Sequence, residues 1–183
     1  MTYFELLEHW NRTINLTSLR DPDAAMDRLL IEPIAASAYL PARPRLMDIG
    51  SGGGSPAIPL AIALEAASLV MVESHSRKAA FLREAARALE IPFVLVYDGR
   101  LESLSPESLG DKLPDLISIR AVRMDAALLR TVKSLLKPGG KLALFSSKTS
   151  PPDLESALLH VDATYPLPSS AALLLGSDPN AGV

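Results

Sequence analysis

The chain has 183 residues, 48% of them hydrophobic, with a formal net charge of −3 and no cysteine. This length suits one domain with its own core, and the hydrophobic content excludes a disordered protein. The lack of cysteine excludes disulfides, zinc–thiolate sites and thiol nucleophiles. Because the net charge is negative, any nucleic acid must be held by a local basic patch. No apolar run approaches the ~20 residues of a membrane span and the start is unlike a signal peptide, so we expect a cytoplasmic protein.

Residues 1–40 are predicted to form a helical segment ahead of the first strand. A helix is expected over 2–11, where apolar residues recur at helical spacing. A second helix has its N-cap at Asp21, followed by a proline, and continues to about residue 40. We expect it to be disturbed at Pro33, which lacks the N–H that the helix ladder needs.

From residue 45 onward, short apolar runs alternate with helix-like stretches. Five strands are expected, over 45–49, 69–73, 93–97, 115–119 and 141–145. The helices expected between them lie over 55–65, over 76–89 with Ser76 as its cap, and over 124–136. Strands separated by helices of roughly 10–15 residues indicate βαβ units and a parallel sheet.

The C-terminal segment differs from this alternation. Residues 154–176 read as two strands around Pro166–Ser170, which predicts an antiparallel hairpin at the end of the sheet. We therefore expect residues 1–183 to form a single α/β domain. Its core, over 45–176, is predicted to be a seven-stranded, mostly parallel, Rossmann-like sheet.

The most informative motif joins the first expected strand to the helix after it. Residues 48–56 read DIGSGGGSP, and the second strand ends in Glu73. A glycine turn between strand and helix lets the backbone lie against a ligand and directs the free N–H groups of the helix at it. A carboxylate at the end of the next strand can accept hydrogen bonds from both ribose hydroxyls. The pattern predicts a nucleoside site.

The spacing of the glycines narrows the choice of nucleoside. Gly50, Gly52 and Gly54 follow G-x-G-x-G, which is more typical of class I methyltransferases that bind S-adenosylmethionine. Nicotinamide and flavin enzymes have G-x-G-x-x-G instead. An enzyme of that kind, and a loop that serves only the fold, are the alternatives at this point.

A block near the N-terminus is more specific. Residues 9–22 read HWNRTINLTSLRDP and resemble the K-W-N-x-x-x-N-L-T-x-x-R-D-P signature of the bacterial small-subunit ribosomal RNA guanine-N7 methyltransferases, also called glucose-inhibited division protein B. Residues 48–60 are similar to that family's D-V-G-[ST]-G-x-G-x-P-G-I-P-L. Shorter similar blocks are Ser76-Arg77-Lys78 with Phe81-Leu82, Arg100-Leu101-Glu102, and Ile117-Ser118-Ile119-Arg120-Ala121.

The resemblance covers about residues 9–148 and implies a class I fold, S-adenosylmethionine as cofactor and methyl transfer to guanine N7 of 16S ribosomal RNA. Guanine N7 already presents a lone pair, so catalysis would come from positioning and charge stabilisation. No metal is implied, since the histidines show no metal-ligand spacing. The cofactor residues that the motif and the resemblance imply are Asp48, Gly50, Gly52, Gly54, Ser55, Glu73, Leu101, Glu102 and Arg120.

Arg120 and Arg100 are the candidates for catalytic residues. Arg120 ends the fourth expected strand, at the carboxyl edge where ligands bind in open α/β sheets. Each arginine has a structural salt bridge as its alternative. The other candidates also have a second interpretation: Asp48 as an orienting group for the loop, Glu73 as a solvated charge, and Leu101-Glu102 as a surface turn.

The RNA-facing side departs from the family. The family carries an arginine on its final strand, whereas Ser170–Val183 contains neither arginine nor lysine. Ser55 replaces a usually apolar residue, and Arg28-Leu29 stands where Arg-His is common. Methylation of a small molecule or a protein, and nucleoside binding without turnover, are therefore the alternatives.

An RNA substrate predicts a basic patch beside the pocket, formed by Arg12, Arg20, Arg28 and Arg100. Asn15 can face RNA or cap its loop, and Trp10 can stack on a base or belong to the core. The oligomeric state is left open by the sequence.

Overall fold

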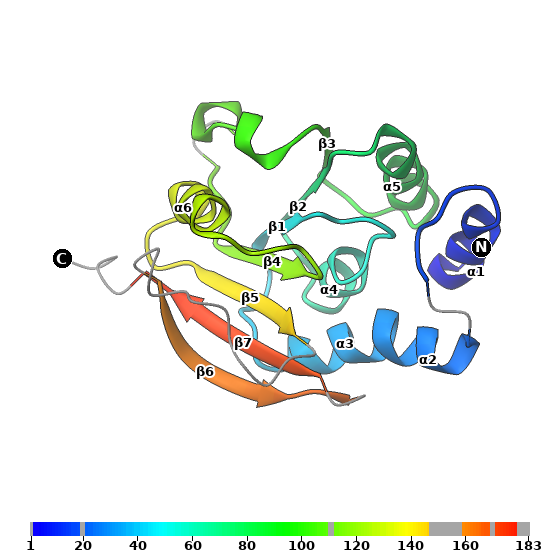
Figure 1. Cartoon of the computed structure of the whole chain (residues 1–183), viewed down its shortest axis with the longest axis horizontal. Coiled ribbons are helices and arrows are strands. Elements are labelled where there is room, and N and C mark those ends of the chain that lie inside the picture. Colours follow the sequence, from blue (N-terminus) through cyan, green and yellow to red (C-terminus); the bar gives the residue numbers. More distant parts are fainter. Residues whose placement is uncertain (1, 19–20, 110–111, 147–158, 169–170, 179–183) are drawn as a thin grey trace.

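The computed structural model describes residues 2–18, 21–109, 112–146, 159–168 and 171–178. Its seven-stranded sheet has the order β3-β2-β1-β4-β5-β7-β6 (Figure 1). The strands are β1 (Arg45–Ile49), β2 (Ser68–Glu73), β3 (Val94–Asp98), β4 (Leu116–Arg120), β5 (Lys141–Ser146), β6 (His160–Pro166) and β7 (Ala172–Ser177). The first five pair in parallel, and β7 pairs antiparallel with both β5 and β6. The predicted α/β fold class is confirmed.

The sheet carries a hydrophobic core on each face. Neighbouring residues of a strand point to opposite faces, so Leu46 and Leu116 belong to one core and Met47 and Ile117 to the other. Strands buried on both faces read as continuous apolar runs, which is why they stood out in the sequence. The helices are α1 (Tyr3–Asn11), α2 (Pro22–Met26), α3 (Glu32–Ser37), α4 (Ala57–Ala63), α5 (Ser76–Ala88) and α6 (Ala126–Leu135).

The helices divide between these two cores. Buried residues of α1, α3, α4 and α5 pack together against one face, and those of α6 pack against the other. The N-terminal helices therefore share a core with the sheet. None of the helices within the described ranges has the length and apolarity that a bilayer crossing requires.

The helix expected from Asp21 to about residue 40 is interrupted. The Asp21 side chain accepts a hydrogen bond from the N–H of Ala24, as an N-cap does, and α2 begins there. A π-helical turn over Asp27–Ile31 then separates α2 from α3. The disturbance expected from Pro33 is present: the irregularity lies in the turn before the proline, whose carbonyls it cannot bond, while α3 continues through the proline itself.

Other differences are small. The predicted cap of α5 was wrong: His75 is the N-cap, and the hydroxyl of Ser76 donates to Asp98 at 3.1 Å instead. Helix α4 is shorter than expected, with Pro56 at its N-cap. The C-terminal hairpin is present as β6 and β7, although 154–158 and 169–170 lie outside the described residues.

Candidate functional site

The candidate site lies where the parallel strands end. Ile49 of β1 is in register with Val72 of β2 and Ile119 of β4, and Glu73 of β2 with Asp98 of β3. The segments after these strands therefore meet at one edge. After β3 the chain returns to the other side of β1, so the strand order reverses between β1 and β4, and ligands bind at such a switch point.

The glycine loop after β1 has a backbone that other residues rarely adopt. Gly50, Gly52 and Gly54 have φ angles of +71°, +52° and +88°. A Cβ on Gly50 would come within 2.5 Å of Val122 Cγ2, and one on Gly54 within 2.7 Å of Ile58 Cδ1. A Cβ on Gly52 would meet nothing closer than a backbone oxygen at 3.7 Å. The outer two glycines are thus needed for packing, whereas Gly52 borders open space.

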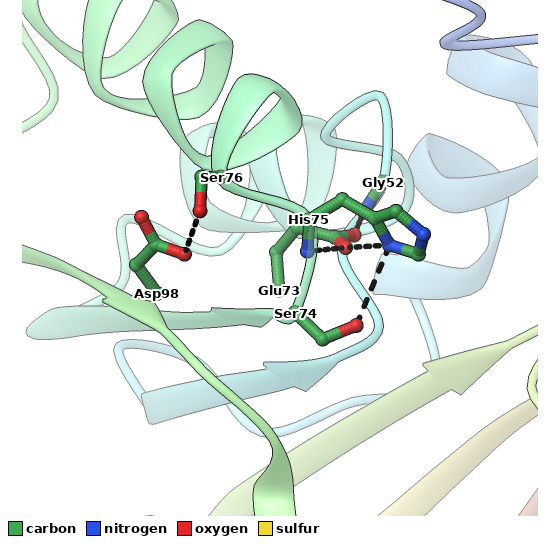
Figure 2. A network of polar contacts seen from close by, with 6 residues as sticks. All are labelled: Gly52, Glu73, Ser74, His75, Ser76 and Asp98. Carbon is green, nitrogen blue, oxygen red and sulfur yellow. Dashed lines mark hydrogen bonds and ion pairs between the residues drawn. The ribbon is translucent and has the colours of Figure 1, made fainter.

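Glu73 is joined directly to this loop. Its Oε2 accepts a hydrogen bond from the N–H of Gly52 at 2.9 Å (Figure 2). Its Oε1 accepts one from the N–H of His75 at 2.8 Å and lies 3.0 Å from His75 Nδ1. The side chain is 6% exposed, so the alternative of a solvated surface charge was wrong. The two parts of the predicted nucleoside motif are in contact.

Asp48 lies beneath the loop and is 1% exposed. Its Oδ1 accepts the hydroxyl of Ser118 at 2.5 Å, while Oδ2 is buried without a partner among the described residues. Burial raises the pKa of Asp48 to about 6, against the lowering effect of the Ser118 hydrogen bond. The hydroxyl of Ser51 also donates to the Asp48 carbonyl at 3.1 Å. These contacts match the loop-orienting interpretation, and direct contact with a cofactor stays a prediction.

Arg120 forms the salt bridge that was its alternative. Its guanidinium, 8% exposed, donates to Glu32 Oε2 at 3.1 Å, and its Nη1 donates to Ser55 Oγ at 3.2 Å and to the carbonyl of Arg28. It also lies 4.7 Å from the ring centre of Phe145. Burial lowers the pKa of Arg120 to about 10, although Glu32 acts to raise it. Burial likewise raises the pKa of Glu32, and Arg120 opposes that shift.

Ser55 is hydrogen-bonded to the N-terminal helical segment. Its hydroxyl donates to the carbonyl of Leu29 at 2.7 Å. The carbonyls of Leu29 and Arg28, which Ser55 and Arg120 contact, belong to the π-helical turn. Pro33 follows this turn and has no N–H to donate to them. Ser55 and Arg120 therefore bind the N-terminal helices to the site, and their contact with a cofactor or a substrate stays a prediction.

The segment after β3 forms a short 3₁₀ turn over Leu101–Ser103. The Leu101 side chain is buried in the core beside α6, whereas Arg100 and Glu102 are exposed. Within the described part of the chain, Arg100 has no ion pair. The segment follows β3 at the same sheet edge as Glu73, and the roles predicted for its residues stay predictions.

The N-terminal block folds against the site. Trp10 packs edge-on to Phe81 of α5, with ring centres 5.8 Å apart, which confirms its core interpretation. The Asn11 side chain accepts the N–H groups of Leu16 and Thr17 at 2.8 and 3.0 Å, and Asn15 is exposed. A cleft of about 540 Å³ opens beside this loop, lined by Phe4, Leu7, Glu8, Asn11, Arg12, Asn15, Thr17, Ser18, Asp21, Pro22 and Ala25.

The sequence interpretation missed Tyr3, Glu32 and Ser118. Two of them could have been found from the sequence, because a buried polar group needs a partner. Glu32 lies within the apolar run LLIEPIAA, which indicates a buried cation beside it, and Ser118 lies between two isoleucines, which indicates a buried polar partner such as Asp48. Nothing in the sequence marked Tyr3, whose hydroxyl donates to the carbonyl of Gly53. Of the expected basic patch, Arg12 lines the cleft and Arg28 is half-buried in the π-helical turn, while Arg20 lies outside the described residues.

Known proteins match most of the chain. A family model described as GidB, rRNA small subunit methyltransferase G, matches residues 1–161. The ribosomal RNA small subunit methyltransferase G of Xanthomonas oryzae pv. oryzae (strain KACC10331 / KXO85) is 39% identical over 142 residues, covering 78% of this chain and 65% of that protein. That of Neisseria gonorrhoeae (strain NCCP11945) is 34% identical over 140 residues, covering 76% and 65%. The chain thus spans 65% of the length of these relatives.

Solved structures share the fold. A SAM-dependent methyltransferase from Aquifex aeolicus matches with a TM-score of 0.67 at 16% identity, covering 88% of this chain and 95% of that chain. The mitomycin 7-O-methyltransferase MmcR matches with a TM-score of 0.65 at 18% identity, covering 96% and 67%. At these identities the likeness establishes the fold alone.

Proposed function

Because the chain belongs to the rRNA small subunit methyltransferase G (GidB) family, we propose that it methylates guanine N7 of 16S ribosomal RNA with S-adenosylmethionine as donor. The observation that carries this proposal is the hydrogen bond from Gly52 to the buried carboxylate of Glu73. It joins a glycine loop of the G-x-G-x-G type to the acid that such sites use for ribose. Because the proposed substrate is ribosomal, we also propose that the protein acts in the cytoplasm.

The residues present fit this cofactor. Each oxygen of a carboxylate can accept two hydrogen bonds. Oε1 of Glu73 already contacts the N–H and Nδ1 of His75, whereas Oε2 accepts only the N–H of Gly52 and retains capacity for a ribose hydroxyl. The open space above Gly52 leaves room for a ligand to lie against the loop. In the proposal, Glu73 holds the ribose, the glycine loop faces the rest of the cofactor, and Leu101 and Glu102 border the adenine. When bound, S-adenosylmethionine supplies a methyl group on a sulfonium.

The protein would act mainly by alignment. Guanine N7 presents its lone pair without deprotonation, so the site needs no general base. We propose that the cleft beside α1 receives the RNA, with the guanidinium of Arg12 and the amide of Asn15 as the contacting groups. The carboxylates of Glu8 and Asp21 also line this cleft. Arg12 and Arg100 are exposed cations at the described surface and suit phosphate contact.

Calorimetric titration with S-adenosylmethionine tests the cofactor site, using Gly52→Arg and Gly139→Arg as a matched pair. Both glycines have positive φ, +52° and +77°, and neither has a side-chain atom where a Cβ would be added. Gly139 lies before β5, at the opposite edge of the sheet. We expect Gly52→Arg to abolish binding, because its side chain enters the ligand's space, and Gly139→Arg to bind like the intact chain.

Equal binding by both variants would place the cofactor elsewhere, and no binding by the intact chain would remove the proposed activity. Methyl transfer is then measured with tritiated donor on 16S RNA and on small subunits that lack the modification. Transfer to guanine N7 supports the full proposal. Binding without transfer to either RNA would favour another acceptor or a domain that binds without turnover.

A further inference from the structure

Helix α1 lies directly on the glycine loop. The buried Tyr3 donates its hydroxyl to the carbonyl of Gly53 at 2.5 Å. One turn later, Leu7 Cδ1 is 3.1 Å from the place where a Cβ on Gly53 would be, and the carbonyl of Leu16 is 3.2 Å from it. The same hydroxyl is 3.3 Å from the corresponding point on Gly54. A segment some fifty residues away in sequence thus covers the loop.

The loop is fixed by contacts to its consecutive glycines. Glu73 accepts the N–H of Gly52 at 2.9 Å, Tyr3 donates to the carbonyl of Gly53, and the N–H of Gly54 donates to the carbonyl of Ser51 at 2.7 Å. Glycine has the largest backbone freedom of any residue, so three in a row need outside contacts to hold one conformation. Tyr3 supplies the contact from the helical side.

The chemistry of Tyr3 suits a permanent donor. Burial raises the pKa of its phenol far above the usual range, so the hydroxyl keeps its proton throughout the physiological range. Its aromatic ring packs in the core that α1 shares with the sheet, which fixes the hydroxyl in place.

We propose that Tyr3 is a positioning residue of the cofactor site, which presets the glycine loop for its ligand through the carbonyl of Gly53. The inference rests on the proposed binding of S-adenosylmethionine. Without the hydroxyl, the Gly53 peptide gains conformations that the ligand must exclude on binding, and that ordering lowers affinity. Removal of the hydroxyl should therefore lower the affinity for the ligand as well as the stability of the fold.

Tyr3→Phe tests this, because it removes only the hydroxyl and keeps the ring. We expect the Kd for S-adenosylmethionine to rise about 5- to 10-fold, the worth of roughly one net hydrogen bond. Tyr39→Phe is the matched control, since Tyr39 stacks on Tyr165 by the amino ends of the strands, and its Kd should equal that of the intact chain.

Amide hydrogen exchange of the unliganded protein gives a second reading that does not depend on the cofactor. We expect the amides of Gly52 and Gly54 to exchange faster in Tyr3→Phe, while those of β1 stay protected. A lower Tm with unchanged Kd and unchanged loop exchange would overturn the inference and make Tyr3 a packing residue only. If the intact chain fails to bind S-adenosylmethionine, the proposed function fails, whereas normal binding by Tyr3→Phe removes the positioning role alone.

Discussion

At the scale of single residues, the buried carboxylate of Asp48 destabilises the fold when it is ionised. One of its carboxylate oxygens has no partner in the described structure, and burial raises its pKa to about 6 from a reference value of 3.8. The folded state therefore binds a proton more tightly than the unfolded chain does. The resulting stabilisation is complete below pH 3.8 and is lost as the pH rises to about 6. Above that range the ionised group remains buried and accepts the hydroxyl of Ser118.

Asp48→Asn should therefore stabilise the protein at pH 8. The amide keeps the shape of the side chain and still accepts the hydroxyl of Ser118, but it removes the buried charge. We expect the free energy of unfolding at pH 8 to rise by on the order of 2 kcal/mol, and the gain to vanish near pH 4. Urea denaturation at both pH values measures this, with the exposed Asp98→Asn as control. A gain of equal size at pH 4 would contradict the electrostatic explanation.

The π-helical turn is the feature that matters most at the element scale. Its Arg28 and Leu29 carbonyls are bonded by Arg120 and Ser55, and Arg120 is paired with the buried Glu32. The break in the helix is thus occupied by side chains from the end of β4 and from the glycine loop. These contacts fix the N-terminal helices to the two segments that form the site.

Glu32→Gln should lower the free energy of unfolding by about 3 kcal/mol, because it removes the buried ion-pair partner of the Arg120 guanidinium. Asp162→Asn is the matched control, since it breaks the Lys141–Asp162 pair, whose side chains are 42% and 29% exposed. An exposed pair contributes less than about 1 kcal/mol. Urea denaturation measures both variants. Equal losses of unfolding free energy in the two variants would mean that burial does not determine how much the Arg120–Glu32 pair stabilises the fold.

Sequence patterns located the elements but not all of their junctions. The central strands were evident because residues on both of their faces are buried, and the carboxyl-edge rule then brought Gly52 to Glu73. Pro33 predicted a disturbance of this helix, but the side chains that bond the π-helical turn could not be foreseen, because they lie far away in sequence. The same holds for Ser76, whose hydroxyl bonds Asp98 across the sheet edge and not its own helix. Rules for helix capping and helix breaking use neighbouring residues alone, so they fail where a polar group is hydrogen-bonded by a side chain from a distant part of the chain.

At the scale of the whole molecule, the site belongs to both cores. The residues of the face that carries α1, α3, α4 and α5 hold the glycine loop, and Leu101 from the segment after β3 belongs to the face of α6. A ligand that contacts the loop and this segment together would therefore stabilise the entire fold and not one layer of it.

Saturation with S-adenosylmethionine should accordingly raise the Tm. A ligand at about 100 times its Kd adds roughly 2.7 kcal/mol, which corresponds to about 5–10 °C for a domain of this size. A thermal scan with and without the cofactor measures the shift. Gly139→Arg should show the same shift as the intact chain and Gly52→Arg none. A shift that survives in Gly52→Arg would mean that the ligand stabilises the protein from another place.

The order β5-β7-β6 has a consequence for synthesis of the protein. Strand β6 pairs only with β7 within the described sheet, and β7 alone joins it to β5. During translation β6 leaves the ribosome first but has no strand to pair with until β7 follows. The outer edge of β5 thus stays open until residues 172–177 emerge, and open strand edges invite mispairing with other chains. A polypeptide stalled before residue 172 would therefore present an unfinished sheet, because β7 is the strand that covers the outer edge of β5.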